Sequence, residues 1–193
     1  MRFLSLLFHQ DLQNNMEENP TIKPLIKTLL ISMFVLGFQP FFAQNNWKLI
    51  KDEKNIQIYL RKEENSKYLS FKAKMNCTSS IESIFNQIKN VSNYPKWFAF
   101  TKSTTLLRQN KSGQFFYMET NYLWPYDNES MNYDMTFQKT KNSYFITISG
   151  SKPTIETKRT LKKVNGYILI EQLKNKSQIT YYMHSEPSQK IPA

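Results

Sequence analysis

The chain has 193 residues, of which 40% are hydrophobic and 15% aromatic, so it can bury the core of one folded domain. Its formal net charge is +11, but the lysines are scattered along the chain and arginine is rare. It has 4 glycines and neither the Gly-x-Gly-x-x-Gly nor the Gly-x-x-x-x-Gly-Lys pattern, which argues against a nucleotide-binding loop. We interpret the basicity as a solvated surface and expect no nucleic-acid partner; a patch attracted to an anionic membrane or to nucleic acid is the alternative.

The N-terminal part has the order of a secretory signal peptide. Two lysines precede a short apolar stretch, residues 29–38, and Ala43 offers a small side chain for cleavage. A membrane span needs about 20 apolar residues, which is longer than this stretch. We therefore expect residues 1–43 to be a targeting segment and residues 44–193 to be a periplasmic or secreted domain. An uncleaved membrane anchor is the alternative.

Alternation of apolar and polar residues predicts two half-buried strands, at 55–61 and 68–75. The alternation returns after residue 113 and predicts further strands at 114–123, at 131–137, around 144–148, at 158–171 and at 177–185. Within the 158–171 run, Asn165-Gly166 is a turn signal that would split it into a hairpin.

Between these two groups of strands the hydrophobic period becomes helical. Ile81, Ile84, Phe85 and Ile88 follow the spacing of one helix face. Ser79 is a candidate N-cap, with Glu82 three residues later to complete a capping box. Two strands, a short helical region and a long antiparallel meander predict an α+β domain.

Few residues offer catalytic or metal-binding chemistry. Outside the leader, His184 is the one histidine, and its strand position suits a structural role better than that of a general base. Cys77 is the one cysteine, which excludes an intrachain disulfide and favours a small buried thiol. Glu119, Asp127, Glu129 and Asp134 are candidate carboxylates without a spacing that supports acid–base catalysis. We expect no metal, no cofactor and no enzymatic activity.

The order of motifs from Trp47 onward resembles a bacterial START domain of the helix-grip superfamily. The resemblance is carried by residues 47–51 and 55–61 as opening strands, Asn93-Tyr-Pro-Lys-Trp97 after the helix, Leu123-Trp-Pro125, and the 186–193 stretch ending in Ile-Pro-Ala. It implies a curved antiparallel sheet around a cavity for a lipid or other hydrophobic molecule, with possible membrane-surface contact.

The sequence departs from the START pattern at three places. Glu129-Ser130 stands where the family commonly has Arg-Asp, and Ser188-Gln189 replaces a pair of glycines. The family's sheet is closed by a long C-terminal helix after the Ile-Pro stretch, whereas this sequence stops at Ala193. We therefore expect the closing C-terminal helix to be missing, as in a truncated gene product.

Methionine and aromatic side chains on the predicted strand faces are candidates for the cavity wall, because methionine adapts to ligands of varied shape. Periodicity alone favours an ordinary packed core for them, whereas the START resemblance implies that they line a ligand cavity. The candidates are Trp97, Met118, Trp124, Met131, Tyr133, Met135 and Phe137.

Two other functions fit the same pattern. A helix-grip cyclase or hydrolase acting on an aromatic substrate would need Glu119, Asp134 or His184 to point into the cavity. An envelope interaction protein without a ligand would have a solid core.

Overall fold

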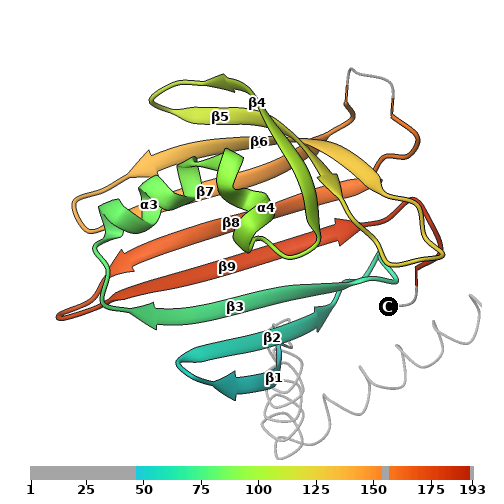
Figure 1. Cartoon of the computed structure of the whole chain (residues 1–193). Coiled ribbons are helices and arrows are strands. Elements are labelled where there is room, and N and C mark those ends of the chain that lie inside the picture. The colour runs from blue at the N-terminus through green and yellow to red at the C-terminus, as the bar shows by residue number, and fades with distance from the viewer. Residues whose placement is uncertain (1–46, 154–156, 192–193) are drawn as a thin grey trace, which may run out of the picture. The chain divides into compact units, whose positions relative to one another are not determined.

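The computed structural model describes residues 47–153 and 157–191, so the expected targeting segment lies outside the described residues. Within them, nine strands form one antiparallel sheet in the order β1-β2-β3-β9-β8-β7-β6-β5-β4 (Figure 1). The strands are β1 (Lys48–Glu53), β2 (Ile56–Lys62), β3 (Leu69–Cys77), β4 (Thr101–Gln109), β5 (Gly113–Thr120), β6 (Glu129–Lys139), β7 (Ser143–Ser151), β8 (Lys163–Gln172) and β9 (Ser177–Glu186). The helices are α3 (Ile81–Lys89), the short 3₁₀ helix η1 (Val91–Asn93) and α4 (Tyr94–Trp97). The α+β prediction is confirmed.

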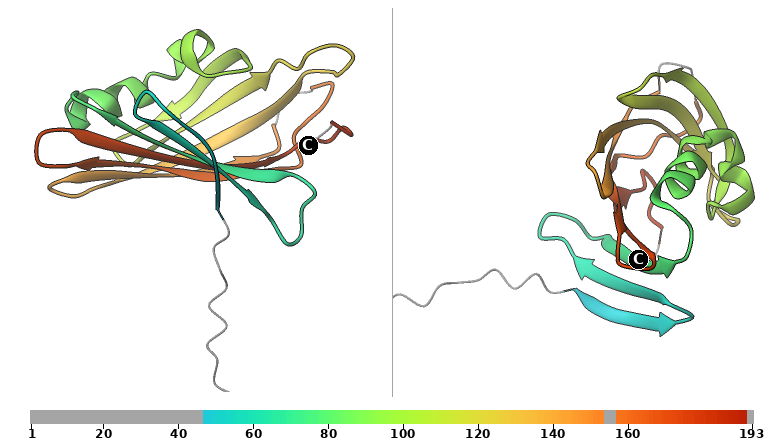
Figure 2. Two further views of the ribbon diagram at one scale, coloured as in Figure 1. Left: turned by 90° about the horizontal axis from the view of Figure 1, so that it is seen from below. Right: turned by 90° about the vertical axis from the view of Figure 1, so that its left-hand side faces the viewer.

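The N-terminal and C-terminal parts of the domain form opposite sides of the sheet. The hairpins β1–β2–β3 form one side; the helical segment then carries the chain to the far edge, where β4 begins. From β4 each strand pairs with the next until β9 meets β3, with Phe71 opposite Met183. Both helices lie on the same side of the sheet, which bends around them (Figure 2). We call the helix-bearing side the concave face.

Helix α3 is fixed to the concave face by its predicted apolar row. Ile81, Ile84 and Ile88 are buried. Phe85 stacks on Tyr144 of β7, with ring centroids 4.1 Å apart. The helical period read from the sequence is therefore confirmed.

The predicted N-cap of α3 was wrong by one residue. Ser80 caps the helix, because its side chain accepts a hydrogen bond from the Ser83 N–H at 3.2 Å. The carbonyl of Ser79 instead accepts from the Ser177 hydroxyl of β9 at 2.7 Å. Glu82 reaches Lys139 of β6 at 3.6 Å. The residue predicted as the cap thus contacts the sheet, and the next serine caps the helix.

The predicted turn at Asn165-Gly166 was also wrong, since both residues lie inside β8. A Cβ on Gly166 would lie 2.3 Å from the carbonyl oxygen of Tyr182 on β9. Glycine is needed here because the backbones of β8 and β9 approach closely. In the sequence, a glycine with this role cannot be distinguished from a glycine in a turn.

The core lies between the concave face and the helices. Phe116, Ile146 and Ile170, on three different strands, are fully buried. Residues 187–191, the described stretch after β9, form no helix. No helix among the described residues is long and apolar enough to cross a membrane.

Candidate functional site

A groove of about 650 Å³ lies between the helices and the part of the concave face formed by β2, β3, β9 and β8. None of the side chains found to line it is charged. The lining residues are Ile56, Ala73, Met75, Cys77, Ser79, Ser83, Ile84, Gln87, Ile88, Trp97, Phe98, Ile168, Ile179 and Tyr181. The groove therefore offers an extended apolar wall with a few neutral polar groups.

Helix α3 forms one wall of the groove with two neighbouring rows of side chains. Ile84 and Ile88 are buried, whereas Ser83 and Gln87 are exposed, and members of each row are four residues apart. Side chains at this spacing lie on the same helix face. The apolar row faces inward and the polar row forms an exposed margin.

A second, much smaller space of about 10 Å³ lies deeper, under α4. It shares Trp97, Phe98, Ile168 and Tyr181 with the groove, so the two spaces are neighbours on either side of common side chains. We refer to it as the inner space.

Four of the seven predicted site residues border these spaces. Trp97 lines both, while Met118, Tyr133 and Met135 line the inner space. Met118, Tyr133 and Met135 are also members of the packed core, each no more than 5% exposed. They form the floor under the helices rather than the walls of the larger groove.

The other three predicted residues line neither space. Met131 is buried beneath Gly150, whose Cβ would lie 3.1 Å from the Met131 Cγ. Phe137 meets Phe85 of α3 edge-on at 5.0 Å between ring centroids. Trp124 is 92% exposed on the loop between β5 and β6.

Sequence reasoning missed the half of the groove on β3 and β9. Ala73 and Met75 share one face of β3, and Ile179 and Tyr181 share one face of β9. The alternation that reveals these faces is present in the sequence. What it lacks is any sign that β3 and β9, separated by about 100 residues, are neighbours.

Three tyrosines of the site, Tyr94, Tyr133 and Tyr181, carry polar hydroxyls into its apolar lining. Tyr94 donates to the carbonyl of Ile88 at 2.6 Å and so ties α4 to α3. Burial raises the pKa of Tyr133 and raises that of Tyr181 well above its ordinary value, so both remain neutral phenols.

The candidate bases do not line the groove. Asp134 alternates with Tyr133 and Met135 and therefore faces the opposite side of β6. Glu119 is engaged by Lys102 at 3.1 Å and Asn128 at 3.0 Å. Cys77 does line the groove, where it is half-buried rather than fully buried as expected.

His184 belongs to a buried hydrogen-bond chain on the face away from the groove. Its Nδ1 lies 3.1 Å from the Ser70 hydroxyl, and its Nε2 lies 3.0 Å from Glu186. This order of serine, histidine and carboxylate is that of a hydrolase triad. Ser70, however, is fully buried and donates its hydroxyl proton to Glu63, so a substrate cannot reach it. The chain connects the β2–β3 hairpin to β9 and is structural.

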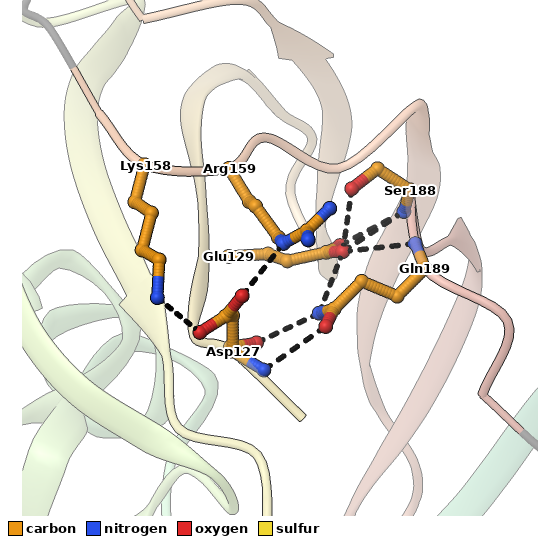
Figure 3. Close-up of polar contacts among 6 residues, drawn as sticks. All are labelled: Asp127, Glu129, Lys158, Arg159, Ser188 and Gln189. Carbon is orange, nitrogen blue, oxygen red and sulfur yellow. Dashed lines mark hydrogen bonds and ion pairs between the residues drawn. The ribbon is translucent and has the colours of Figure 1, made fainter. Parts of the chain in front are cut away.

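A second polar cluster surrounds Glu129, which is fully buried at the start of β6. Its carboxylate accepts hydrogen bonds from the backbone and side chains of Ser188 and Gln189 (Figure 3). Beside it, Asp127 forms ion pairs with Lys158 and Arg159, and their hydrogen bonds lower the pKa of Asp127. Through these hydrogen bonds and ion pairs the cluster links the segments around residues 127–129, 158–159 and 188–189.

Exposed apolar side chains gather next to α4. Phe100 and Leu123 are 65% and 76% exposed, and both line a shallow depression together with Trp97 and Phe98 of the groove. Trp124 follows directly on the same loop, and Lys96 borders the depression. We call Phe100, Leu123 and Trp124 the apolar tip.

Comparison with known proteins gives no matching family model. An uncharacterized protein of Pseudomonas aeruginosa is 23% identical over 177 residues, covering 89% of this chain and 88% of that protein. A STAR-related lipid transfer protein fragment from Xanthomonas axonopodis superposes with a TM-score of 0.70 at 19% identity, over 76% of this chain and 85% of the other. Human StAR-related lipid transfer protein 5 gives 0.66 at 9% identity, over 90% and 86%. The chain therefore has the START, or helix-grip, fold.

Proposed function

We propose that this protein binds a lipid or other hydrophobic small molecule, for storage or transfer, in the groove between α3, α4 and the concave face. The observation that carries the proposal is the groove's uncharged, predominantly apolar wall. The likeness of the fold to structures of lipid transfer proteins supports it.

The size of the groove suits this role. Its volume of about 650 Å³ falls within the roughly 300–1,000 Å³ typical of small-molecule sites. Affinity would come mainly from burial of apolar surface, at about 25 cal/mol per Å² before the costs of ordering.

The proposal assigns binding rather than catalysis. A reaction in the groove would need an acid or base that reaches the ligand. Glu119, Asp134 and His184, the residues an enzyme would have to use, are held elsewhere by their own partners or by strand direction.

The proposed setting is the periplasm or the cell exterior, as the leader-like segment suggests. There the apolar tip would contact a membrane and place the adjoining groove close to the source of its ligand. Trp97 and Phe98 support this arrangement because they border both the groove and the depression beside the tip.

The test is native mass spectrometry of the purified full chain, before and after organic extraction, with a matched pair of variants. Ala73 and Lys74 are adjacent on β3 but face opposite sides, and only Ala73 lines the groove. Wild type and Lys74→Trp should carry an extractable hydrophobic mass, or take up an added apolar fluorophore. Ala73→Trp should lose this binding while keeping the far-ultraviolet circular dichroism of a folded sheet. Equal binding by Ala73→Trp and Lys74→Trp would show that the groove is not the site.

A further inference from the structure

Two tyrosines border the deep end of the site. Tyr133 and Tyr181 both line the inner space, and Tyr181 also lines the groove. Within residues 47–153 and 157–191, neither hydroxyl has a hydrogen-bond partner. Polar atoms buried without a partner are costly, and none occurs among the described side chains. These two oxygens therefore border open space rather than packed apolar atoms.

The charge of the wall limits what can be held here. No lysine, arginine or histidine is among the residues found to line the groove or the inner space. An ionised carboxylate or phosphate buried there would lack a compensating cation, which is strongly unfavourable. Because burial keeps both phenols protonated, they offer a neutral donor and acceptor.

The size of the inner space limits the polar group further. At about 10 Å³ it approaches the roughly 10–15 Å³ that one water-sized oxygen occupies. A hydroxyl or carbonyl oxygen fits this space, whereas a phosphate or a sugar is several times too large.

We infer that the ligand is an uncharged hydrophobic molecule whose single terminal oxygen, as a hydroxyl or carbonyl, hydrogen-bonds to Tyr133 and Tyr181 while its apolar body fills the groove. This inference rests on the proposed function and names the class of molecule that the site selects. It excludes free fatty acids and other ligands that would enter with a charged end first.

The experiment compares three probes with the same alkyl chain: dodecanol, dodecanoate and dodecane. Each displaces the neutral fluorophore N-phenylnaphthylamine from the full-chain protein at about pH 8, where the carboxylate is ionised. Dodecanol should displace the fluorophore at a concentration about tenfold or more below that of dodecanoate. Equal or tighter binding of dodecanoate would overturn the inference while leaving the proposed function standing. If neither the fluorophore nor any probe binds, the proposed function itself fails.

Tyrosine-to-phenylalanine variants locate the oxygen. Tyr133→Phe and Tyr181→Phe each remove one hydroxyl and keep the ring, so dodecanol should bind about three- to tenfold more weakly. Dodecane binding should not change, which also confirms that the groove is intact. Tyr167→Phe is the control, because Tyr167 stacks with Phe145 on the opposite face. Unchanged dodecanol affinity in both variants would show that the oxygen lies elsewhere.

Discussion

Gln189 donates two hydrogen bonds to one carboxylate oxygen of Glu129, from its backbone N–H at 3.1 Å and from its side-chain amide at 3.0 Å. Both residues stand at positions where the sequence departs from the START motifs that it otherwise resembles. The two departing residues are thus in direct contact in the structure. A carboxylate on β6 is buried because the segment after β9 supplies its donors, and a glycine at 189 would lack the side-chain donor.

This contact predicts a specific loss of stability. Glu129→Ala should lower the free energy of unfolding by about 2–3 kcal/mol, because buried donors lose a charged acceptor. Urea denaturation followed by tryptophan fluorescence measures the change. Glu53→Ala, on an exposed residue of β1, is the control and should shift stability by less than about 0.5 kcal/mol.

A double-mutant cycle tests whether Glu129 and Gln189 act as a pair. Gln189→Gly should be less damaging in the Glu129→Ala background than in the wild type. Strict additivity of the two changes would mean that their hydrogen bonds contribute nothing to stability.

Phe85 should be the main anchor of α3. Its ring stacks on Tyr144 and meets Phe137 edge-on, so Phe85→Ala should cost about 2–4 kcal/mol. Phe85→Leu should cost less, since it retains most of the apolar volume. Because α3 is a wall of the groove, fluorophore affinity should fall in the same order as stability. Normal fluorophore affinity in a destabilised Phe85→Ala protein would show that α3 does not contribute to the binding site.

Stability should fall at acid pH through two carboxyls near His184. The hydrogen bond from His184 lowers the pKa of Glu186, and the hydrogen bond from Ser70 lowers the pKa of Glu63. A carboxyl whose pKa is depressed on folding stabilises the fold above its unfolded pKa of about 4.3, and this contribution disappears as the pH falls through the folded pKa.

The urea midpoint should therefore decline as the pH is lowered below about 4.3. In a Glu63→Gln/Glu186→Gln variant the midpoint should start lower at neutral pH and depend less on pH over the acid range. If the urea midpoint of this variant falls with pH as steeply as that of the wild type, groups other than Glu63 and Glu186 cause the acid destabilisation.

Vesicle binding should depend on the apolar tip. Trp124→Ser combined with Leu123→Ser removes two of its side chains, which are 92% and 76% exposed. Co-sedimentation with vesicles containing anionic lipid should fall, whereas Leu107→Ser, equally polar but on the edge strand β4, should bind as the wild type does. Added salt should weaken the wild-type interaction, given the basic charge of the chain. Salt-insensitive binding would remove the electrostatic part of the proposal.

The sequence predicted those elements whose periodicity is undisturbed. Residues 131–137 alternate cleanly and lie inside β6. Strand β4 was not predicted, because register shifts at Thr101/Ser103 and Leu106/Arg108 break its period of two. Next to such a bulge, the adjacent leucines 106 and 107 both lie on an exposed strand. Two neighbouring apolar residues do not alternate with polar ones, so they give no sequence signal for a half-buried strand.

The predicted site residues and the residues that line the groove differ for a physical reason. Met118, Tyr133 and Met135 were correctly placed on strand faces, but α3 and α4 cover that part of the concave face and turn it into packed core. Open space remains beside Ala73, Met75 and Ile179. The position of the helices on the sheet determines which part of the concave face stays uncovered. That position depends on contacts between residues far apart in the sequence, which hydrophobic periodicity does not reveal.

Among the described strands, β1 and β4 form the two edges of the sheet. A free edge is a template on which another chain can add a strand, the first step toward fibrillar aggregation. Strand β1 reads Lys-Leu-Ile-Lys-Asp-Glu with every residue exposed, so charges line that margin. Strand β4 carries two irregularities that interrupt a continuous ladder. Charges on β1 and bulges in β4 therefore disfavour strand addition at both edges of the sheet whose concave face holds the apolar groove.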